Sequence, residues 1–226
     1  MKNQNSIGNP ATRRDFLGLS LAALGVAIGG SLVPGLMPVA EAQAATDAAQ
    51  RIADHFSSVR TMMGEFVQFG PKGEQTGGKF FIERPGKIRF NYEAPAAFRV
   101  ISDGESVVLN NQKLKTWDLY PLSKTPLKLL LDDRIDLTGS KVKSVKEEDD
   151  LTTIQLADKS VFGNSKLTMM FDPKSYELRQ WTITDAQGKD TTVMIFNVKQ
   201  GVSFAADTFK IDYSKVANST EINKNK

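Results

Sequence analysis

The sequence predicts a mainly β protein, an incomplete (half-open) antiparallel β-barrel covered by an N-terminal helix and an inserted helical hairpin. Three observations support this prediction. After Gly64, apolar residues alternate along many short runs, turn signals separate those runs, and two apolar stretches have helical spacing instead. With 226 residues, 40% of them hydrophobic, the chain can bury one sizeable core.

Residues 1–44 have the layout of an export signal, so they are set aside before the fold is considered. Arg13 and Arg14 precede an uncharged, glycine-containing run, which ends in a small-residue tail suited to a signal peptidase. The paired arginines predict the twin-arginine route, with the general secretory route and a retained membrane anchor as alternatives. Residues 45–226 are then expected to form a single domain in the periplasm.

Two regions of this domain have helical patterns. The first helix is expected over about residues 46–62, where apolar residues recur at spacings of three and four and Thr46 supplies an N-cap. The second helical region is expected over about residues 112–132, where Thr125 and Pro126 form a good helix start. Together these regions could act as a lid over the open mouth of a curled sheet.

The strands are indicated by side-chain alternation and by turn residues. Two runs flanking Pro85-Gly86 predict a β-hairpin in which Phe80, Ile82 and Arg84 share one face. Further strands are expected over residues 98–102, 106–110, 142–145, 151–156, 166–171, 178–184, 191–198 and 209–213. Short strands at such even spacing favour one antiparallel meander, curled as a barrel or half-barrel.

Composition excludes several classes of function. A chain without Cys has no disulfide, thiolate nucleophile or Cys-based metal site, and a single His rules out multi-His metal sites. That residue, His55, lies at the edge of the first helical stripe, where an exposed surface His is the simplest interpretation. The 29 basic and 26 acidic residues are well mixed, so nucleic acid is not an expected partner. We therefore expect no enzymatic activity, metal or cofactor.

The apolar residues of the predicted sheet and lid have two possible roles. They line a ligand cavity or they fill a solid core, and periodicity does not distinguish the two. The candidates for a lipid-binding cavity are Phe66, Phe80, Ile82, Ile88, Phe90, Trp117, Leu129 and Leu130. Arg84 shares a face with Phe80 and Ile82, and a guanidinium brought towards an apolar interior must find acceptors. The alternative is a solvated arginine at the end of a strand.

Several short motifs follow one another in a characteristic order. They are Phe66-x-Gln68, Gly78-x-Phe80, Glu83-Arg84-Pro85-Gly86-Lys87-x-Arg89-Phe90-x-Tyr92, Pro95, Ser102-Asp103-Gly104, Thr125-Pro126-Leu127, Trp181 before Asp185-x-x-Gly188, and Phe209-Lys210-Ile211. Each is weak alone, but together they span nearly the whole predicted mature chain. In this order and spacing the chain resembles the periplasmic outer-membrane lipoprotein carrier proteins of the LolA type.

The resemblance implies a strongly curved, incomplete barrel whose apolar interior receives the acyl chains of a lipoprotein. It implies a monomeric chaperone that takes acylated lipoproteins from an inner-membrane ATP-driven extractor and hands them to an outer-membrane acceptor. The matching arginine, Arg84, is implied to be a lid clasp that bonds lid backbone groups when the cavity is empty. A carrier or sensor of another amphiphile, such as a glycolipid or phospholipid, is the alternative function.

The role of four lysines in the second helical region has two possible interpretations. Lys113, Lys115, Lys124 and Lys128 either face an acidic partner or anionic lipid head groups, or they are solvated surface lysines.

Overall fold

The computed structural model describes residues 39–137, 141–157 and 164–224, with side chains described from residue 47 to residue 218. Most of the predicted export signal, including Arg13 and Arg14, lies outside the described residues. Among the helices of the described ranges, none is both long enough and apolar enough to cross a membrane.

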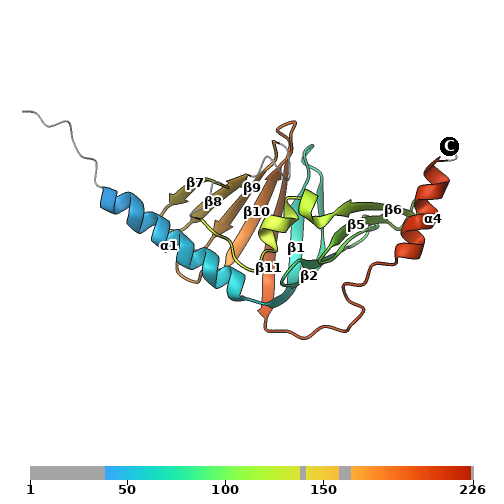
Figure 1. The fold of residues 1–226 in the computed structure, drawn as a ribbon, viewed down its shortest axis with the longest axis horizontal. Coiled ribbons are helices and arrows are strands. Elements are labelled where there is room, and N and C mark those ends of the chain that lie inside the picture. Colours follow the sequence, from blue (N-terminus) through green and yellow to red (C-terminus); the bar gives the residue numbers. More distant parts are fainter. Residues whose placement is uncertain (1–38, 138–140, 158–163, 225–226) are drawn as a thin grey trace, which may run out of the picture. The chain divides into compact units, whose positions relative to one another are not determined.

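The described chain forms one antiparallel sheet of eleven strands (Figure 1). The strands are β1 (Thr61–Phe69), β2 (Gln75–Glu83), β3 (Lys87–Tyr92), β4 (Phe98–Asp103), β5 (Ser106–Asn111), β6 (Thr116–Pro121), β7 (Val142–Glu147), β8 (Thr152–Ala157), β9 (Lys166–Phe171), β10 (Leu178–Thr184) and β11 (Asp190–Gln200). Their order is β6-β5-β4-β3-β2-β1-β11-β10-β9-β8-β7, so β6 and β7 are the two edges. The sheet is therefore unclosed, and the prediction of a mainly β fold with a few helices is confirmed.

Helices lie against both faces of this sheet (Figure 1). On the inner face, the helix α1 (Val39–Ser58) and the single-turn helix α2 (Leu127–Leu130) contribute to the main hydrophobic cluster, and α2 follows the short 3-10 helix η1 (Leu122–Lys124). On the outer face, α4 (Tyr213–Lys224) lies near β6. We call residues 39–59, which comprise α1 and Val59, together with residues 122–137 the lid.

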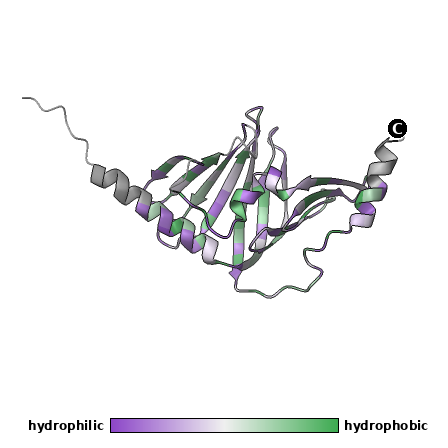
Figure 2. Cartoon of the chain, in the orientation of Figure 1, coloured by the Kyte–Doolittle hydropathy of each residue, from purple (hydrophilic) through white to green (hydrophobic). Residues whose placement is uncertain are grey.

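Side chains separate by strand parity into two apolar clusters. Along β1 and β2 buried residues alternate with more exposed ones, as expected for strands with one covered face. Figure 2 shows hydrophobic and hydrophilic residues interspersed along the strands. The larger cluster lies on the inner face and joins the lid helices to β1–β3 and β8–β11. The smaller cluster lies on the outer face and comprises Ile101, Val108, Ile211 and Val216, with Trp117 packed against it.

The two expected helical regions differ from the structure. The first helix begins at Val39, before Thr46, and ends at Ser58 instead of residue 62. It ends early because the Arg60 carbonyl accepts a hydrogen bond from the Arg84 backbone N–H at 2.7 Å, and the chain is extended from there. The second region is not a helical hairpin. Residues 116–121 form β6, and only η1 and the four-residue α2 are helical.

The reason for the strand at β6 is the tight turn that precedes it. The Asn111 side-chain oxygen accepts hydrogen bonds from the backbone N–H groups of Lys113 and Leu114, and Lys115 has a φ of 55°. This turn returns the chain alongside β5, where Trp117 pairs with Asn110. The helix-like spacing of the apolar residues is overridden by strand pairing.

The strand expected over residues 209–213 is also absent. Residues 201–212 cross the outer face without joining the ladder and are held by side chains instead. Arg89 donates to the Thr208 carbonyl at 2.8 Å, and the rings of Phe204 and Phe209 lie edge to face at 5.3 Å. Tyr213 begins α4, which the sequence pattern did not indicate.

Gly78 is expected to be essential to the pairing of β2 with β3. A Cβ atom at this position would lie 2.0 Å from the backbone oxygen of Asn91, so Gly78→Ala would push the two strands apart. We expect a loss of about 3 kcal/mol in the free energy of unfolding, measured by urea denaturation. Gly73→Asn is the control, because Gly73 lies in an open turn with a φ of 79°, which Asn tolerates. Equal losses in the two variants would contradict this interpretation.

Candidate functional site

The inner face of the sheet and the lid bring together seven of the eight residues expected to line a cavity. Phe66, Phe80, Ile82, Ile88, Phe90, Leu129 and Leu130 all belong to the larger cluster, and none is more than 5% exposed. Their rings are closely packed, with Phe66 edge to face against Phe90 at 4.8 Å and against Tyr92 at 5.0 Å. In this arrangement the side chains themselves fill the centre of the site.

Trp117 does not join these residues. It lies on β6 opposite Asn110 and packs against the outer-face cluster, where the Lys215 ammonium lies 5.8 Å from its ring centroid. Its inclusion among the cavity residues was wrong, because that inclusion assumed a helix that points its apolar face at the sheet. As a strand residue, Trp117 faces the side opposite to Phe80 and Ile82.

Arg84 lies at the point where the lid meets the sheet. It follows β2 directly, is 4% exposed, and donates from Nη1 to the Val59 carbonyl at 2.9 Å and from Nη2 to the Leu130 carbonyl at 3.3 Å. Its guanidinium carbon also lies 4.2 Å from the ring centroid of Phe56. One side chain of the sheet therefore contacts both α1 and α2 parts of the lid.

The electrostatics of Arg84 are unfavourable for a residue of the folded core. Within the described part of the chain it forms no ion pair, and its Nε has no hydrogen-bond partner. Burial, followed by the nearby charge of Arg60, lowers the pKa of the Arg84 guanidinium to about 10. Because the folded state holds this proton less tightly than the unfolded chain, the charge costs stability at neutral pH, a cost relieved only as the pH rises above about 10. A buried cation held by two carbonyl groups and an aromatic ring, with no carboxylate partner among the described residues, is suited to a contact that must break.

The two parts of the lid are joined to each other by side chains of α1. Gln50 donates to the Ile135 carbonyl at 2.9 Å and accepts from the Leu137 N–H at 2.8 Å, and the Ser57 hydroxyl accepts from the Ile135 N–H at 3.2 Å. Asp54 forms a two-pronged ion pair with Arg134, which lowers the pKa of Asp54. The lid is therefore one connected unit that Arg84 fastens to the sheet.

Gln50→Ala tests this connection. We expect the free energy of unfolding to fall by about 2 kcal/mol, because two backbone groups of residues 135 and 137 lose their partner. Urea denaturation measures the loss, and Gln155→Ala serves as the control since its amide bonds only the Thr168 hydroxyl on the neighbouring strand. A loss no greater than that of the control would mean that Gln50 does not join the lid.

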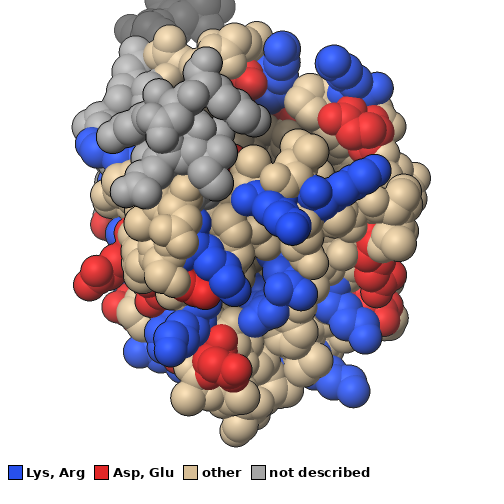
Figure 3. All heavy atoms as spheres, turned by 90° about the vertical axis from the view of Figure 1, so that its right-hand side faces the viewer, with Lys and Arg blue, Asp and Glu red and all other residues tan. Residues whose placement is uncertain are grey.

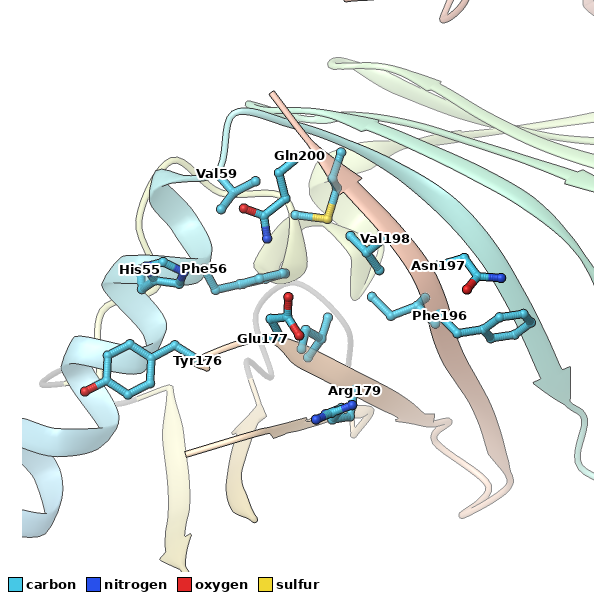
Figure 4. A pocket seen from close by; sticks show the side chains of 13 residues that line it. His55, Phe56, Val59, Tyr176, Glu177, Arg179, Phe196, Asn197, Val198 and Gln200 are labelled. Carbon is cyan, nitrogen blue, oxygen red and sulfur yellow. The ribbon is translucent and has the colours of Figure 1, made fainter. Parts of the chain in front are cut away.

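A pocket opens beside this clasp, between the end of α1 and strands β10 and β11 (Figure 4). Its volume is about 300 Å³. Its lining includes the apolar side chains of Phe56, Val59, Met62, Leu178, Ile195 and Val198. It also includes polar or charged side chains, among them His55, Glu177, Arg179, Asn197 and Gln200, and Figure 4 shows the Glu177 carboxylate directed into the pocket. The apolar interior therefore reaches the surface at this point.

The shape of the pocket depends on a β-bulge in β11. Asn197 and Val198 together lie opposite Gly64 of β1, where the register shifts, and Asn197 has a φ of 52°. The extra residue turns Val198 and Gln200 to the same inner side as Ile195. Sequence reasoning missed these pocket residues because simple alternation along residues 191–198 places Val198 on the opposite face from Ile195.

The four lysines of the second region do not form one group. Lys113 and Lys115 are exposed in the turn between β5 and β6, Lys124 ends η1, and Lys128 is ion-paired with Asp132. Figure 3 shows the end of the molecule at α4 and β6, where Lys and Arg side chains are interspersed with Asp and Glu. The exposure of Lys113, Lys115 and Lys124 and the ion pair of Lys128 favour the interpretation of these lysines as solvated side chains.

Comparison with known proteins assigns the family. The sequence model of the outer membrane lipoprotein carrier protein LolA matches residues 57–212, which include the whole sheet and Arg84. The chain belongs to the LolA family. Its α4 helix begins one residue after the end of this match.

Relatives over most of the chain carry the same description. An outer-membrane lipoprotein carrier protein from Chromohalobacter salexigens is 27% identical over 189 residues, covering 78% of this chain and 88% of the relative. One from Pseudomonas paraeruginosa is 25% identical over 177 residues, covering 73% and 83%. Among solved structures, a LolA superfamily protein from Nitrosomonas europaea has a TM-score of 0.41 at 11% identity, covering 73% of this chain and 98% of that chain. The LolA family is one of carriers, not of enzymes.

Proposed function

We propose that this LolA-family protein carries acylated lipoproteins through the periplasm, with their acyl chains enclosed between the inner face of the sheet and the lid. The single observation that carries this proposal is the buried Arg84, which fastens a connected lid over an apolar interior through hydrogen bonds to two carbonyl groups. The family membership supports the choice of cargo.

The energetics match this task. Each methylene of an acyl chain costs about 0.8 kcal/mol when it is exposed to water, so the chains of one lipoprotein need an apolar shelter to cross an aqueous compartment. The inner cluster supplies that shelter once its side chains move apart. No covalent step is needed, and the cargo leaves unchanged.

Reversibility follows from the clasp. In the empty protein the interior is filled by side chains such as Phe66 and Leu130, and Arg84 holds the lid closed. Cargo that separates the lid from the sheet breaks the bonds to Val59 and Leu130, and these bonds re-form when the cargo departs. The regained bonds offset part of the free energy lost on release, so the cargo is held firmly but not permanently.

The proposed cycle has two membrane partners. An inner-membrane ATP-driven extractor loads the carrier and an outer-membrane acceptor unloads it. Export by the twin-arginine route and removal of the signal near residue 44 place the mature protein in the periplasm. Cleavage there would also remove the first residues of α1, which begins at Val39.

Incubation of the purified mature protein with inner-membrane spheroplasts tests the function. We expect newly made outer-membrane lipoproteins to appear in the soluble fraction only when the protein is present, and to pass from there to isolated outer membranes. Release of phospholipid or glycolipid without lipoprotein would favour the alternative carrier of another amphiphile. Release of neither would refute a carrier function.

A further inference from the structure

The pocket beside α1 shares two of its wall residues with the clasp. Phe56 lines the pocket and also contacts the Arg84 guanidinium, with 4.2 Å from the guanidinium carbon to the ring centroid. Val59 lines the pocket too, and its carbonyl accepts the 2.9 Å hydrogen bond from Arg84. Any molecule that enters deeply enough to move these two residues therefore acts on the clasp directly.

Part of the lining of the pocket fits the end of an acyl chain. Its apolar side chains include Phe56, Val59 and Ile195, its polar ones include the Glu177 carboxylate, and its volume of about 300 Å³ is at the lower end of the range for small-molecule sites, about 300–1,000 Å³. At the mouth, Figure 4 shows the Gln200 amide directed towards the pocket, where it can donate to an ester or amide carbonyl. Arg179 at the mouth is already ion-paired with Asp172 at 2.6 Å, so it offers no unpaired charge to an anion.

A second pocket between the lid and β8 provides the contrast. It is smaller, at about 180 Å³, and Asp132, Arg134, Asp136 and Lys141 make four of its seven lining residues charged. It includes neither Phe56 nor Val59. An apolar chain entering here would have to pass several charges and would not act on the Phe56 ring or on the Val59 carbonyl.

We propose that the pocket formed by α1, β10 and β11 is the access port for the first acyl chain of the cargo, and that Phe56 and Val59 transmit its arrival to Arg84. This inference rests on the proposed carrier function. The chain enters at Gln200, displaces the Phe56 ring and the Val59 carbonyl from the guanidinium, and so opens the lid from the α1 side. Phe56 and Val59 are positioning residues for the clasp.

Association kinetics of a fluorescent long-chain fatty acid, anthroyloxy-palmitate, test the port with the mature protein. Val198→Trp fills the pocket and Gln200→Trp obstructs its exposed mouth, while Lys141→Trp places the same ring at the exposed mouth of the second pocket. We expect both port variants to associate at least tenfold more slowly than the wild type and Lys141→Trp to match it. Thermal unfolding checks that each variant is folded, and Gln200→Trp remains informative if Val198→Trp is not.

Three outcomes are distinguishable. Slow association in the two port variants alone supports the port. Wild-type rates in both, or slow association only in Lys141→Trp, would overturn it while leaving the carrier function intact. If the wild type binds no probe at all, the port and the carrier function both fail.

Hydrogen exchange tests the transmission to Arg84. When the probe binds the wild type, we expect the backbone amides of Lys128 in α2 and of Leu131, which follows it, to exchange at least tenfold faster, because the lid separates from the sheet. Phe56→Leu is expected to bind the probe with little of this acceleration, and Phe56→Tyr to retain it. Phe56→Met replaces the leucine variant if that variant does not fold. Equal acceleration in the wild type and the variant without the ring would refute transmission through Phe56.

Discussion

Arg84→Leu is expected to fold normally and to load cargo, yet to pass it to an acceptor about 100-fold less readily than the wild type. Two hydrogen bonds from a charged group, each worth about 1.5–3 kcal/mol, stabilise the closed, empty state and not the loaded one. Without them, the return to the empty state loses about 3 kcal/mol of its driving force, which corresponds to a reduction of about 100-fold in transfer. Transfer from the loaded variant to isolated outer membranes measures the effect.

The stability of Arg84→Leu is not expected to fall with its transfer activity. The buried Arg84 charge has no carboxylate partner among the described residues and its pKa is lowered to about 10, so its burial is costly. Unfolding returns this charge to water, so the burial cost offsets the two hydrogen bonds, and replacement by leucine should leave the free energy of unfolding unchanged or raise it. The transfer step differs, because we expect the guanidinium to stay inside the loaded protein, so that only the hydrogen bonds distinguish the empty from the loaded state. Arg89→Leu is the matched control, because Arg89 lies on the next strand and faces the outer side, where it bonds Asn91 and Thr208. Unimpaired transfer by Arg84→Leu, or equal impairment by Arg89→Leu, would remove Arg84 from the mechanism.

Phe66→Ala is expected to lower the free energy of unfolding by about 3–5 kcal/mol. A fatty acid is expected to stabilise this variant more than it stabilises the wild type. Phe66 is 1% exposed and contacts the rings of Phe90 and Tyr92, so its truncation leaves a cavity in the inner cluster. A ligand present at about 100 times its Kd adds about 2.7 kcal/mol of stability. Thermal unfolding with and without palmitate measures both effects.

Trp117→Ala supplies the control for the inner face. It is also a change from a large aromatic residue to alanine, but Trp117 packs on the outer face against the cluster of Ile101 and Val108. Its response to palmitate should equal that of the wild type. A fatty acid that stabilises Trp117→Ala more than Phe66→Ala would indicate an acyl site on the outer face and contradict the proposal.

Local patterns were sufficient for most of the sheet. The alternation around Pro85-Gly86 predicted the β2–β3 hairpin and the inward face of Arg84, and the boundaries of β9 and β10 were predicted correctly. Local patterns gave the wrong element where pairing with a neighbouring strand determined the structure. The apolar spacing from Leu114 to Leu122 is compatible with a helix, and only the turn set by Asn111 makes part of it a strand.

The site depends on contacts that no local pattern contains. The acceptors of Arg84 come from Val59 and Leu130, which lie 25 and 46 residues away along the chain. The pocket requires the bulge at Asn197, an irregularity that alternation conceals. The sequence placed Arg84 on the same face as Phe80 and Ile82 but left its burial open. The joining of the two lid parts through Gln50 and Ser57 required the structure.

Native mass spectrometry of the mature protein, recovered after incubation with inner-membrane spheroplasts and combined with lipid extraction, tests the central claim most directly. Enclosure of acyl chains between the sheet and the lid predicts a soluble one-to-one complex with an acylated lipoprotein, and predicts that removal of the acyl chains from the lipoprotein abolishes it. Recovery of the protein without cargo, or binding of the lipoprotein that persists after deacylation, would contradict it.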